Sequence, residues 1–268
     1  MTRMPLRSWL TVSAISLAAL GLVACDTARD DSSKWPPERL YTEAREEQAA
    51  GAYEKAIRLY ERLEGRAAGT MLAQQAMLQR AYLLWKTAEQ AQALATIERF
   101  LKLHPTSPAY DYALYLQGLI NFNDNLGFFG SFAAHDLSER DQQASRDAYQ
   151  SFRQLTERFP QSSYAEDARL RMDYIVNSLA AYEVHVARYY FRRGAYVAAA
   201  NRAQATVQEF QRSPATEEAL FIMAQSYDKL GLTQLRDDAD RVLRTSFPNT
   251  QIHTLGLGNK QTPWWRPW

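Results

Sequence analysis

The sequence predicts an all-α fold made of recurring helix pairs. From Glu38 onward the apolar residues are spaced as in amphipathic helices, and no sustained alternation of apolar and polar residues indicates a strand. Proline ends one helix after another, and the last two such prolines, Pro214 and Pro248, are 34 residues apart. That distance is the tetratricopeptide period, so we expect an α-solenoid of about five tetratricopeptide repeats.

The first 24 residues have the layout of an export signal. Arg3 and Arg7 precede an uncharged run from Ser8 to Ala24, which is short for a membrane-spanning helix. The run ends in Leu-Val-Ala-Cys25, which resembles the lipobox of bacterial lipoproteins, where the cysteine is acylated and the signal is cut before it. We therefore expect a signal peptide at 1–24 and a lipid anchor on Cys25. The alternative is a plain secretory signal followed by a free thiol.

Composition restricts the kind of partner. Without the two arginines of the signal, the 31 basic residues fall to 29 against 30 acidic residues, a formal charge of −1 for the mature chain. This balance argues against nucleic acid as a ligand. The chain has 15 tyrosines, more than a helical core requires, and tyrosine-rich surfaces often bind proteins.

Prolines, glycines and polar segments divide the mature chain into parts. Residues 25–37 are polar with two prolines and are typical of an extended, lipid-anchored linker. The repeats follow within 38–248, and residues 249–268, which include three tryptophans, are expected to form a flexible tail. The expected repeats are 38–65, 70–104, 109–159, 164–210 and 216–247.

Two of these repeats are longer than the others. Residues 123–139 break the helical pattern of the third repeat, which predicts a loop between a helix at 109–122 and another at 140–158. No helix breaker occurs from Tyr164 to Arg193, so we expect a single helix of about 30 residues there.

The same residue types recur in the turns between the predicted helices. Gly51 and Gly194 each begin a Gly-x-Tyr-x-x-Ala pattern inside a helix hairpin, and Gly231 has the same place in the last repeat. The second repeat has Trp-Lys-Thr-Ala88 in place of a glycine turn. Between repeats, we expect Ser107 and Ser213 to cap helices in which the following proline is the first residue, and Ser163 to form a capping box with Glu166.

No catalytic or metal-binding motif is present in the sequence. The four histidines are isolated, and no serine-hydrolase, zinc-protease or phosphate-binding pattern occurs. We therefore expect a binding protein without enzymatic activity, cofactor or metal.

Three segments stand out as candidate binding surfaces. Phe128 and Phe129 lie in a glycine-framed loop, where the rings either face a partner or fold back onto neighbouring helices. Tyr190, Arg192 and Arg193 end the long predicted helix, and arginines beside tyrosines could dock acidic residues of a partner. The third segment is Pro-Trp-Trp-Arg-Pro-Trp at 263–268, which could pack on the last helices, lie at a lipid interface or bind a partner.

Several motifs together resemble the tetratricopeptide lipoproteins of the bacterial β-barrel assembly machinery. The resemblance spans most of 35–214 and includes the looped third repeat, which generic tetratricopeptide similarity would not reproduce. The segments that carry it are Leu103-His-Pro-Thr-Ser-Pro108, Gly127-Phe-Phe-Gly130, Phe159-Pro-Gln-Ser-Ser-Tyr164 and Arg193-Gly-Ala-Tyr196.

The resemblance implies a scaffold anchored by lipid at the periplasmic face of the outer membrane. Its implied partners are the POTRA domains of the barrel-forming subunit, other assembly lipoproteins and unfolded outer-membrane protein precursors. By motif position Arg193 is the expected POTRA contact. Tyr53 and Tyr60 are expected at the precursor site from repeat geometry.

Two features depart from the family pattern. Asp26, directly after the lipobox cysteine, resembles the signal that retains lipoproteins at the inner membrane in enteric bacteria. The Trp-rich tail has no role in the family pattern. The alternative function is a tetratricopeptide scaffold of another envelope machine, such as pilus assembly or peptidoglycan remodelling.

Overall fold

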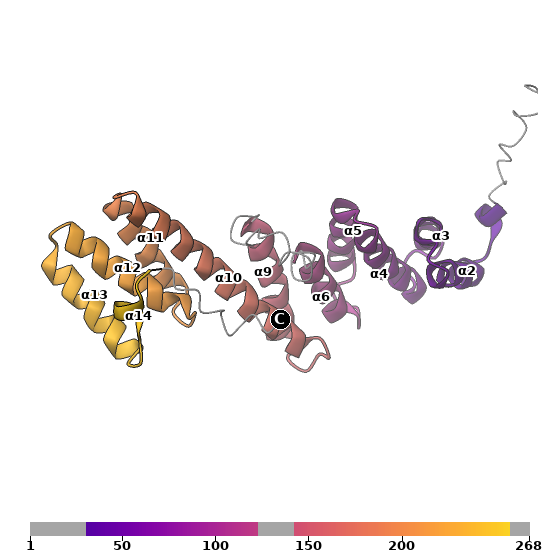
Figure 1. Ribbon diagram of the computed structural model, residues 1–268. Coiled ribbons are helices and arrows are strands. Elements are labelled where there is room, and N and C mark those ends of the chain that lie inside the picture. Colours follow the sequence, from indigo (N-terminus) through magenta and orange to yellow (C-terminus); the bar gives the residue numbers. More distant parts are fainter. Residues whose placement is uncertain (1–30, 123–141, 258–268) are drawn as a thin grey trace, which may run out of the picture. The chain divides into compact units, whose positions relative to one another are not determined.

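The computed structural model describes residues 31–122 and 142–257 of the chain. These residues form eleven α-helices and one 3₁₀ helix, with no strand among them, so the all-α prediction is confirmed. The chain divides into two compact units, one ending at Ala76 and one beginning at Met77. The division falls inside helix α4 (Met71–Lys86). Figure 1 labels the helices in chain order.

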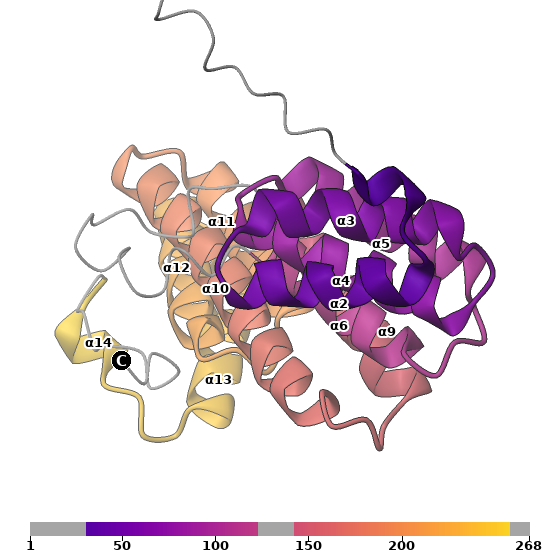
Figure 2. The ribbon, with the colours of Figure 1, turned by 90° about the vertical axis from the view of Figure 1, so that its right-hand side faces the viewer.

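The first unit contains a helix hairpin with a short segment packed against it. Helix α2 (Pro37–Ala49) lies beside α3 (Tyr53–Arg66), as Figure 2 shows in indigo. The 3₁₀ helix η1 (Asp31–Lys34) precedes them, and its Ser32 is buried. The Arg62 guanidinium donates a hydrogen bond to Ser32 Oγ. From Asp31 onward, the segment expected as an extended linker is therefore folded onto α3.

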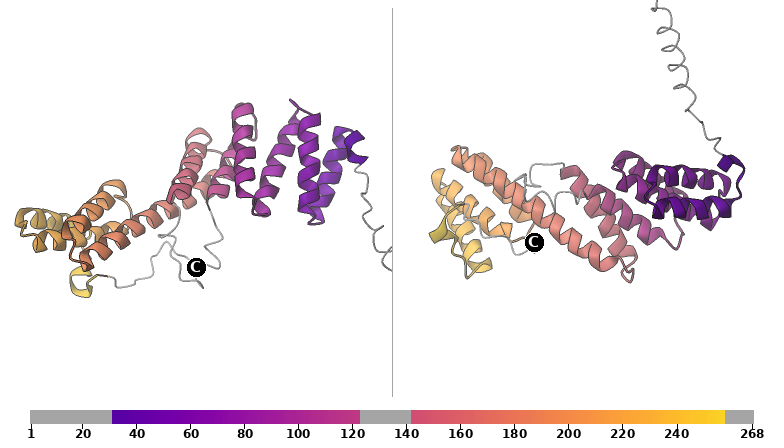
Figure 3. Two further views of the ribbon diagram at one scale, coloured as in Figure 1. Left: turned by 90° about the horizontal axis from the view of Figure 1, so that it is seen from above. Right: turned by 45° about the vertical axis from the view of Figure 1, so that its right-hand side comes forward.

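The second unit is a row of helices in which each packs on the next. α5 packs on α6, α6 on α9, α9 on α10, and the order continues to α13 (Figures 1 and 3). α10 also contacts α12, and a short α14 contacts α12. The bounds are α5 (Gln90–Leu103), α6 (Tyr110–Asn121), α9 (Gln142–Arg158), α10 (Ala165–Arg192), α11 (Tyr196–Glu209), α12 (Ala215–Lys229), α13 (Thr233–Ser246) and α14 (Ile252–Leu255).

Helix α10 joins two parts of the core of this unit. Its 28 residues confirm the single long helix expected from the absence of a breaker. Ile175 and Leu179, in its middle, pack with Phe152 of α9. Val184 and Ala187, one to two turns later, pack with residues of α11 and α12. The third and fourth repeats therefore share one continuous helix (Figure 3).

The α6–α9 contact depends on a glycine. Gly118 is buried on α6, and a Cβ atom added there would come within 2.4 Å of the Phe152 ring. Real Cβ contacts are never that short, so the helices approach this closely only because position 118 has no side chain. The missing side chain brings the α6 backbone against the aromatic core of the third repeat.

The connections between repeats differ from the expected caps. α6 and α12 begin at Tyr110 and Ala215, so their N-caps are Ala109 and Pro214 rather than Ser107 and Ser213, although Pro214 already has helical backbone angles. The expected capping box at Ser163 is also wrong, because α10 begins at Ala165 with no side-chain cap.

A serine hydroxyl instead stabilises the turn before each of these helices. The Oγ atoms of Ser107, Ser162 and Ser213 each accept a hydrogen bond from the backbone N–H two residues later, at 3.2–3.3 Å. Thr250 does the same for Ile252 at the start of α14. The chain thus uses one turn motif four times at the ends of repeats.

The turns inside the hairpins need a left-handed residue. Gly51, Gly194 and Gly231 have φ values of +78°, +76° and +71°, in the region where glycine carries no steric penalty. In the second hairpin Ala88 takes this place with φ +64°, and it is the non-glycine residue of positive φ in the described part of the chain. The residue after it closes the same turn, since the Glu89 N–H donates to the Leu84 carbonyl at 2.8 Å.

The end of the described chain is folded onto the last hairpin. Ile252 and Leu257 pack against Leu220, Phe221 and Leu243 of α12 and α13. His253 lies with its Nε2 atom 3.2 Å from an Asp240 carboxylate oxygen. The first part of the expected flexible tail therefore covers the end of this unit.

Candidate functional site

Several residues expected to have a functional role lie outside the described residues. These are Cys25 with its lipobox, Phe128 and Phe129 of the expected loop, and the tryptophans of the C-terminal segment. Their expected roles stay predictions. The remaining candidates are the turn at Arg193 and the tyrosines of the first hairpin.

The turn between α10 and α11 presents cations beside an aromatic surface. Arg193 follows the last residue of α10, and its N–H donates to the Tyr189 and Tyr190 carbonyls at 3.2 and 3.1 Å. Gly194 then reverses the chain with positive φ, and α11 begins two residues later. Arg192 and Arg193 are both exposed. The local fold therefore projects two guanidinium groups from a backbone fixed by helix-ending hydrogen bonds.

The aromatic residues at this turn divide into an outer and an inner set. The Arg193 guanidinium carbon lies 5.4 Å from the centroid of the Tyr189 ring, and 52 % of Tyr189 is exposed. Tyr190 is half-buried and packs against the core shared by α10, α11 and α12. The exposed aromatic neighbour of Arg193 is thus Tyr189, which the sequence does not distinguish from Tyr190.

Further apolar side chains are exposed at the same end of the helices. Val197, at the start of α11, is 59 % exposed. Alternate turns in a row of antiparallel helices lie at one end, and Figure 1 shows the α12–α13 turn at the same end as the α10–α11 turn. Leu230 and Leu232 in that turn are also exposed. This end of the second unit, from Tyr189 to Leu232, combines cationic and apolar groups, as protein-binding surfaces do.

The two tyrosines of the first hairpin have different surroundings. Tyr53 begins α3 and is 37 % exposed. Tyr60 is fully buried, and its hydroxyl donates to Gln48 Oε1 at 2.9 Å. Burial, together with the nearby Tyr41 hydroxyl, raises the pKa of Tyr60 to about 12. Tyr60 holds α2 to α3 and offers no surface to a precursor, which corrects the role expected for it.

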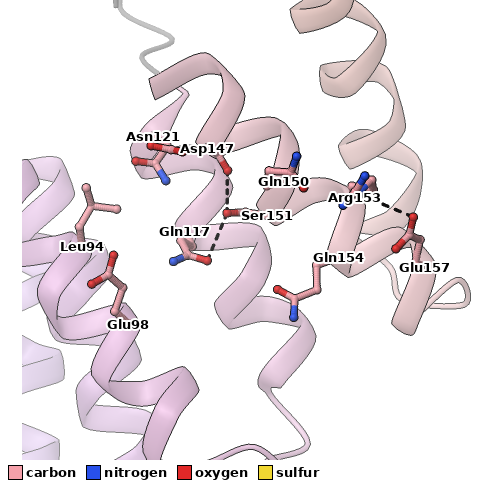
Figure 4. Close-up of a pocket in the computed structure, with 10 residues that line it drawn as sticks. All are labelled: Leu94, Glu98, Gln117, Asn121, Asp147, Gln150, Ser151, Arg153, Gln154 and Glu157. Carbon is pink, nitrogen blue, oxygen red and sulfur yellow. Dashed lines mark hydrogen bonds and ion pairs between the residues drawn. The ribbon is translucent and has the colours of Figure 1, made fainter. Parts of the chain in front are cut away.

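A groove on the second unit was not expected from the sequence. It lies between α5 and α9 over α6, and its volume is about 650 Å³. Figure 4 shows that side chains from all three helices line it. The lining residues are Leu94 and Glu98 from α5, Gln117 and Asn121 from α6, and Asp147, Gln150, Ser151, Arg153, Gln154 and Glu157 from α9.

The groove is lined almost entirely by hydrogen-bonding groups. Ser151 Oγ lies 3.0 Å from the Asp147 backbone carbonyl oxygen and 3.1 Å from Gln117 Oε1, and its single proton can be donated to either (Figure 4). The Arg153 guanidinium is 3.8 Å from a Glu157 carboxylate oxygen on the next turn of α9. No sequence motif marks the groove, because its residues come from three helices and are spaced like ordinary solvated positions.

The described residues provide neither a metal site nor a membrane span. Within 31–122 and 142–257, no group of three or more His, Cys, Asp or Glu side chains is arranged to hold a metal ion. Among the helices of the same ranges, none has the length and apolar character to cross a bilayer.

Comparison with known proteins decides the family. A family model described as YfiO, outer membrane lipoprotein, matches residues 33–242. The chain belongs to this family. The match begins at the 3₁₀ helix and reaches α13, so YfiO membership covers nearly all of the described helices.

Several relatives of this chain carry a common name. An outer membrane protein assembly factor, BamD, from Neisseria meningitidis serogroup A is 44 % identical over 97 % of this chain and 98 % of its own length. Proteins of the same name from Haemophilus influenzae and Vibrio cholerae are 33 % and 35 % identical, covering 91 % and 81 % of this chain and 93 % and 90 % of their own.

Solved structures give weaker matches. The crystal structure of MamA protein covers 84 % of this chain and 97 % of its own, with 15 % identity and a TM-score of 0.37. The crystal structure of BtubC from P. vanneervenii covers 90 % and 91 %, with 17 % identity and a TM-score of 0.30. The family membership rests on the sequence matches.

Proposed function

We propose that this chain is a non-enzymatic scaffold for the assembly of β-barrel proteins at the outer membrane. Relatives that match nearly the whole chain are named outer membrane protein assembly factors. A row of helix hairpins suits a scaffold, because stacked hairpins create extended binding surfaces. The described residues contain no metal-type cluster, and the sequence contains no catalytic motif.

The observation that carries the proposal is the exposed turn at Arg193. Its two arginines and the exposed Tyr189 ring form a fixed projection at one end of the second unit. Arginine and tyrosine are enriched among residues that anchor protein interfaces. We assign this turn to the POTRA domains of the barrel-forming subunit, with acidic residues on the partner facing Arg192 and Arg193.

The remaining parts of the proposal concern the membrane and the precursors. We assign the lipid anchor to Cys25 and the protein to the periplasmic face of the outer membrane. Because Asp26 resembles an inner-membrane retention signal, a localisation experiment has to test which membrane holds the protein. Other assembly lipoproteins are expected partners. Exposed Tyr53, rather than buried Tyr60, is the candidate contact for unfolded precursors.

Site-specific crosslinking tests the proposal. A photoreactive residue replaces Arg193 in living cells, and captured proteins are identified by mass spectrometry from membranes. We expect the barrel-forming subunit in the main crosslinked product. Capture of pilus or cell-wall proteins instead would support a scaffold of another envelope machine and contradict the proposal. A matched probe at Arg212, exposed at the connection between α11 and α12, controls for random contact.

A further inference from the structure

We propose that the Trp-rich segment at 263–268 docks on α13 of its own chain and covers an apolar edge formed by Leu232, Leu235 and Val242. The inference concerns the end of the helix row and does not depend on the proposed function. It follows from the exposure of these three side chains, from the place where the described chain ends and from the composition of the segment.

The α13 edge is an apolar surface on the last long helix of the row. Leu232 is the N-cap of α13, and Leu235 and Val242 lie seven residues apart on it, which places these two on one side of the helix. The three side chains are 43–46 % exposed. The end of a helical solenoid needs a polar outer face to stay soluble, so we expect this edge to be covered.

The C-terminal strap, residues 248–257, covers only the neighbouring side of α13. Leu243, the residue after Val242, is fully buried in the cluster that Ile252 and Leu257 join. Within the strap, α14 has four residues, about one helical turn. It is therefore too short to take the place of a further full-length helix, and the α13 edge stays outside its cover.

The chain that follows the strap is long enough to cover the edge. Leu257 belongs to the same cluster as Leu243, and the eleven residues from Leu243 back to Leu232 span about 17 Å of helix. Trp264 and Trp268 are seven and eleven residues beyond Leu257, which corresponds to as much as about 23 and 36 Å of extended chain. The tryptophans can therefore reach the whole length of the edge.

The composition of the segment suits an apolar helix surface. Pro-Trp-Trp-Arg-Pro-Trp contains three indole rings, and each packed ring buries roughly 150–250 Å². Proline has no backbone N–H, so two of the six residues leave no donor unpaired when the segment leaves water. The same prolines disfavour a helix, so we expect the segment to lie extended along α13.

A tethered segment covers the edge more effectively than a separate partner. A connection of a few residues gives the tethered group an effective concentration on the order of millimolar. An affinity too weak to hold a separate peptide is therefore sufficient for the chain's own segment. Charge does not select a foreign partner here, because α13 carries three aspartates and three arginines.

Fluorine NMR of the purified mature chain, labelled with fluorotryptophan, tests the proposal. Removal of the signal takes away Trp9, so five of the six tryptophans remain, and single Trp→Phe variants assign the three signals of the tail. A synthetic peptide of residues 258–268 gives the positions of these signals in water. We expect the tail signals of the full mature chain to differ from those of the peptide. Signals that coincide with the free peptide would overturn the proposal.

A surface variant places the contact on the α13 edge. The double variant Leu235→Ser/Val242→Ser should move the tail signals to the free-peptide positions, because it removes the apolar surface on which the rings pack. Leu170→Ser, at an exposed site on α10, should leave the signals where they are. Unchanged tail signals in a folded double variant would contradict the proposal.

A reciprocal measurement decides the question if the double variant does not fold by circular dichroism. Serine at the three tail tryptophans alters no described residue. Methyl NMR of that variant should show the signals of the α13 edge displaced, because the neighbouring aromatic rings are lost. The methyl signals of Leu170 should stay unchanged. Edge signals identical to those of the unmodified chain would contradict the proposal.

Other results would identify a different occupant or role. Tail signals that depend on protein concentration would show binding to a second copy. Tail signals that match the free peptide until phosphatidylethanolamine–phosphatidylglycerol vesicles are added would show a membrane segment. Either result would make the proposal wrong. Arg193→Glu should leave the tail signals unchanged, so a failed partner contact at Arg193 and a failed contact at the α13 edge are distinguishable.

Discussion

Arg188 on α10 and Glu218 on α12 form a two-pronged ion pair. The Arg188 Nε and Nη2 atoms each lie 2.7 Å from a Glu218 carboxylate oxygen, and both side chains are 22 % exposed. Paired, parallel hydrogen bonds between charged groups are among the strongest polar contacts in proteins. The pair joins the first helices of two neighbouring repeats and fixes how these two helices pack.

Breaking this pair should destabilise the second unit. We expect Arg188→Met to lower the free energy of unfolding by about 1–3 kcal/mol, because it leaves the Glu218 carboxylate unpartnered at a half-buried position. A double-mutant cycle with Glu218→Gln should give a coupling of about 1 kcal/mol in urea unfolding. The exposed pair Arg241 and Asp238 is the control, with a coupling of at most about 0.5 kcal/mol. Equal couplings for the two pairs would contradict this reading of the contact.

Ala88→Gly should stabilise the protein. Ala88 has φ +64°, where a Cβ atom costs about 1 kcal/mol, and the equivalent turns of three other hairpins have glycine. We expect the free energy of unfolding to rise by about 0.5–1 kcal/mol in chemical denaturation.

A matched substitution controls for the flexibility that glycine adds. Ala50, the exposed residue that directly follows α2, has φ −75°, so Ala50→Gly should lower stability. A loss of stability in Ala88→Gly as well would contradict the left-handed backbone conformation assigned to Ala88.

Three tyrosines should make the protein sensitive to alkali. Burial raises the pKa of Tyr60, Tyr112 and Tyr115 from 10.0 to about 12, and at Tyr115 the hydrogen bond that its hydroxyl donates to Asp167 adds to the rise. The folded state therefore holds these protons more tightly than the unfolded state. The stabilisation is complete below about pH 10 and is lost as the pH rises through about 12.

Thermal unfolding as a function of pH measures this effect. We expect the melting temperature to fall over that range while tyrosinate absorbance rises. Tyr112→Phe should make the fall shallower, because it removes one of the shifted groups. Tyr189→Phe, at an exposed site, should leave the slope unchanged. A slope that is the same in all three proteins would contradict the account.

Arg193→Glu should weaken binding to the POTRA partner. If the guanidinium is a buried anchor of the interface, charge reversal should cost about 2 kcal/mol or more of binding free energy. Titration calorimetry with the purified partner domains measures this, and Arg212→Glu, at an exposed site elsewhere, should change little. An unchanged affinity with an intact fold would make Arg193 an ordinary surface residue.

Periodicity and breakers predicted the helices well because those signals are local. The long α10 followed from the absence of glycine and proline between Tyr164 and Arg193, and the hairpin glycines marked turns that need positive φ. The caps were wrong because Ser-Pro-Ala admits two geometries. A serine hydroxyl can cap a helix or close a turn before it, and Ser107 and Ser213 do the latter.

The burial of individual side chains, and the contacts between residues that are far apart in the sequence, could not be predicted in the same way. Tyr53 and Tyr60 both fit repeat geometry and lie seven residues apart on α3. Tyr53 is exposed, whereas Tyr60 is buried. The Arg188–Glu218 pair and the groove over α6 depend on which helix lies beside which. Charged and amide side chains on helices are usually solvated, so nothing in the sequence singles them out.

The most direct test of the central claim is the amount of folded β-barrel protein in the outer membrane after this protein is depleted. Folded barrels are distinguished by their heat-dependent mobility in gels, with a periplasmic soluble protein as the control. We expect folded barrel proteins to decline as the protein is lost, and to return when the full-length chain is supplied again. An intact population of folded barrels after complete depletion would contradict a role in their assembly.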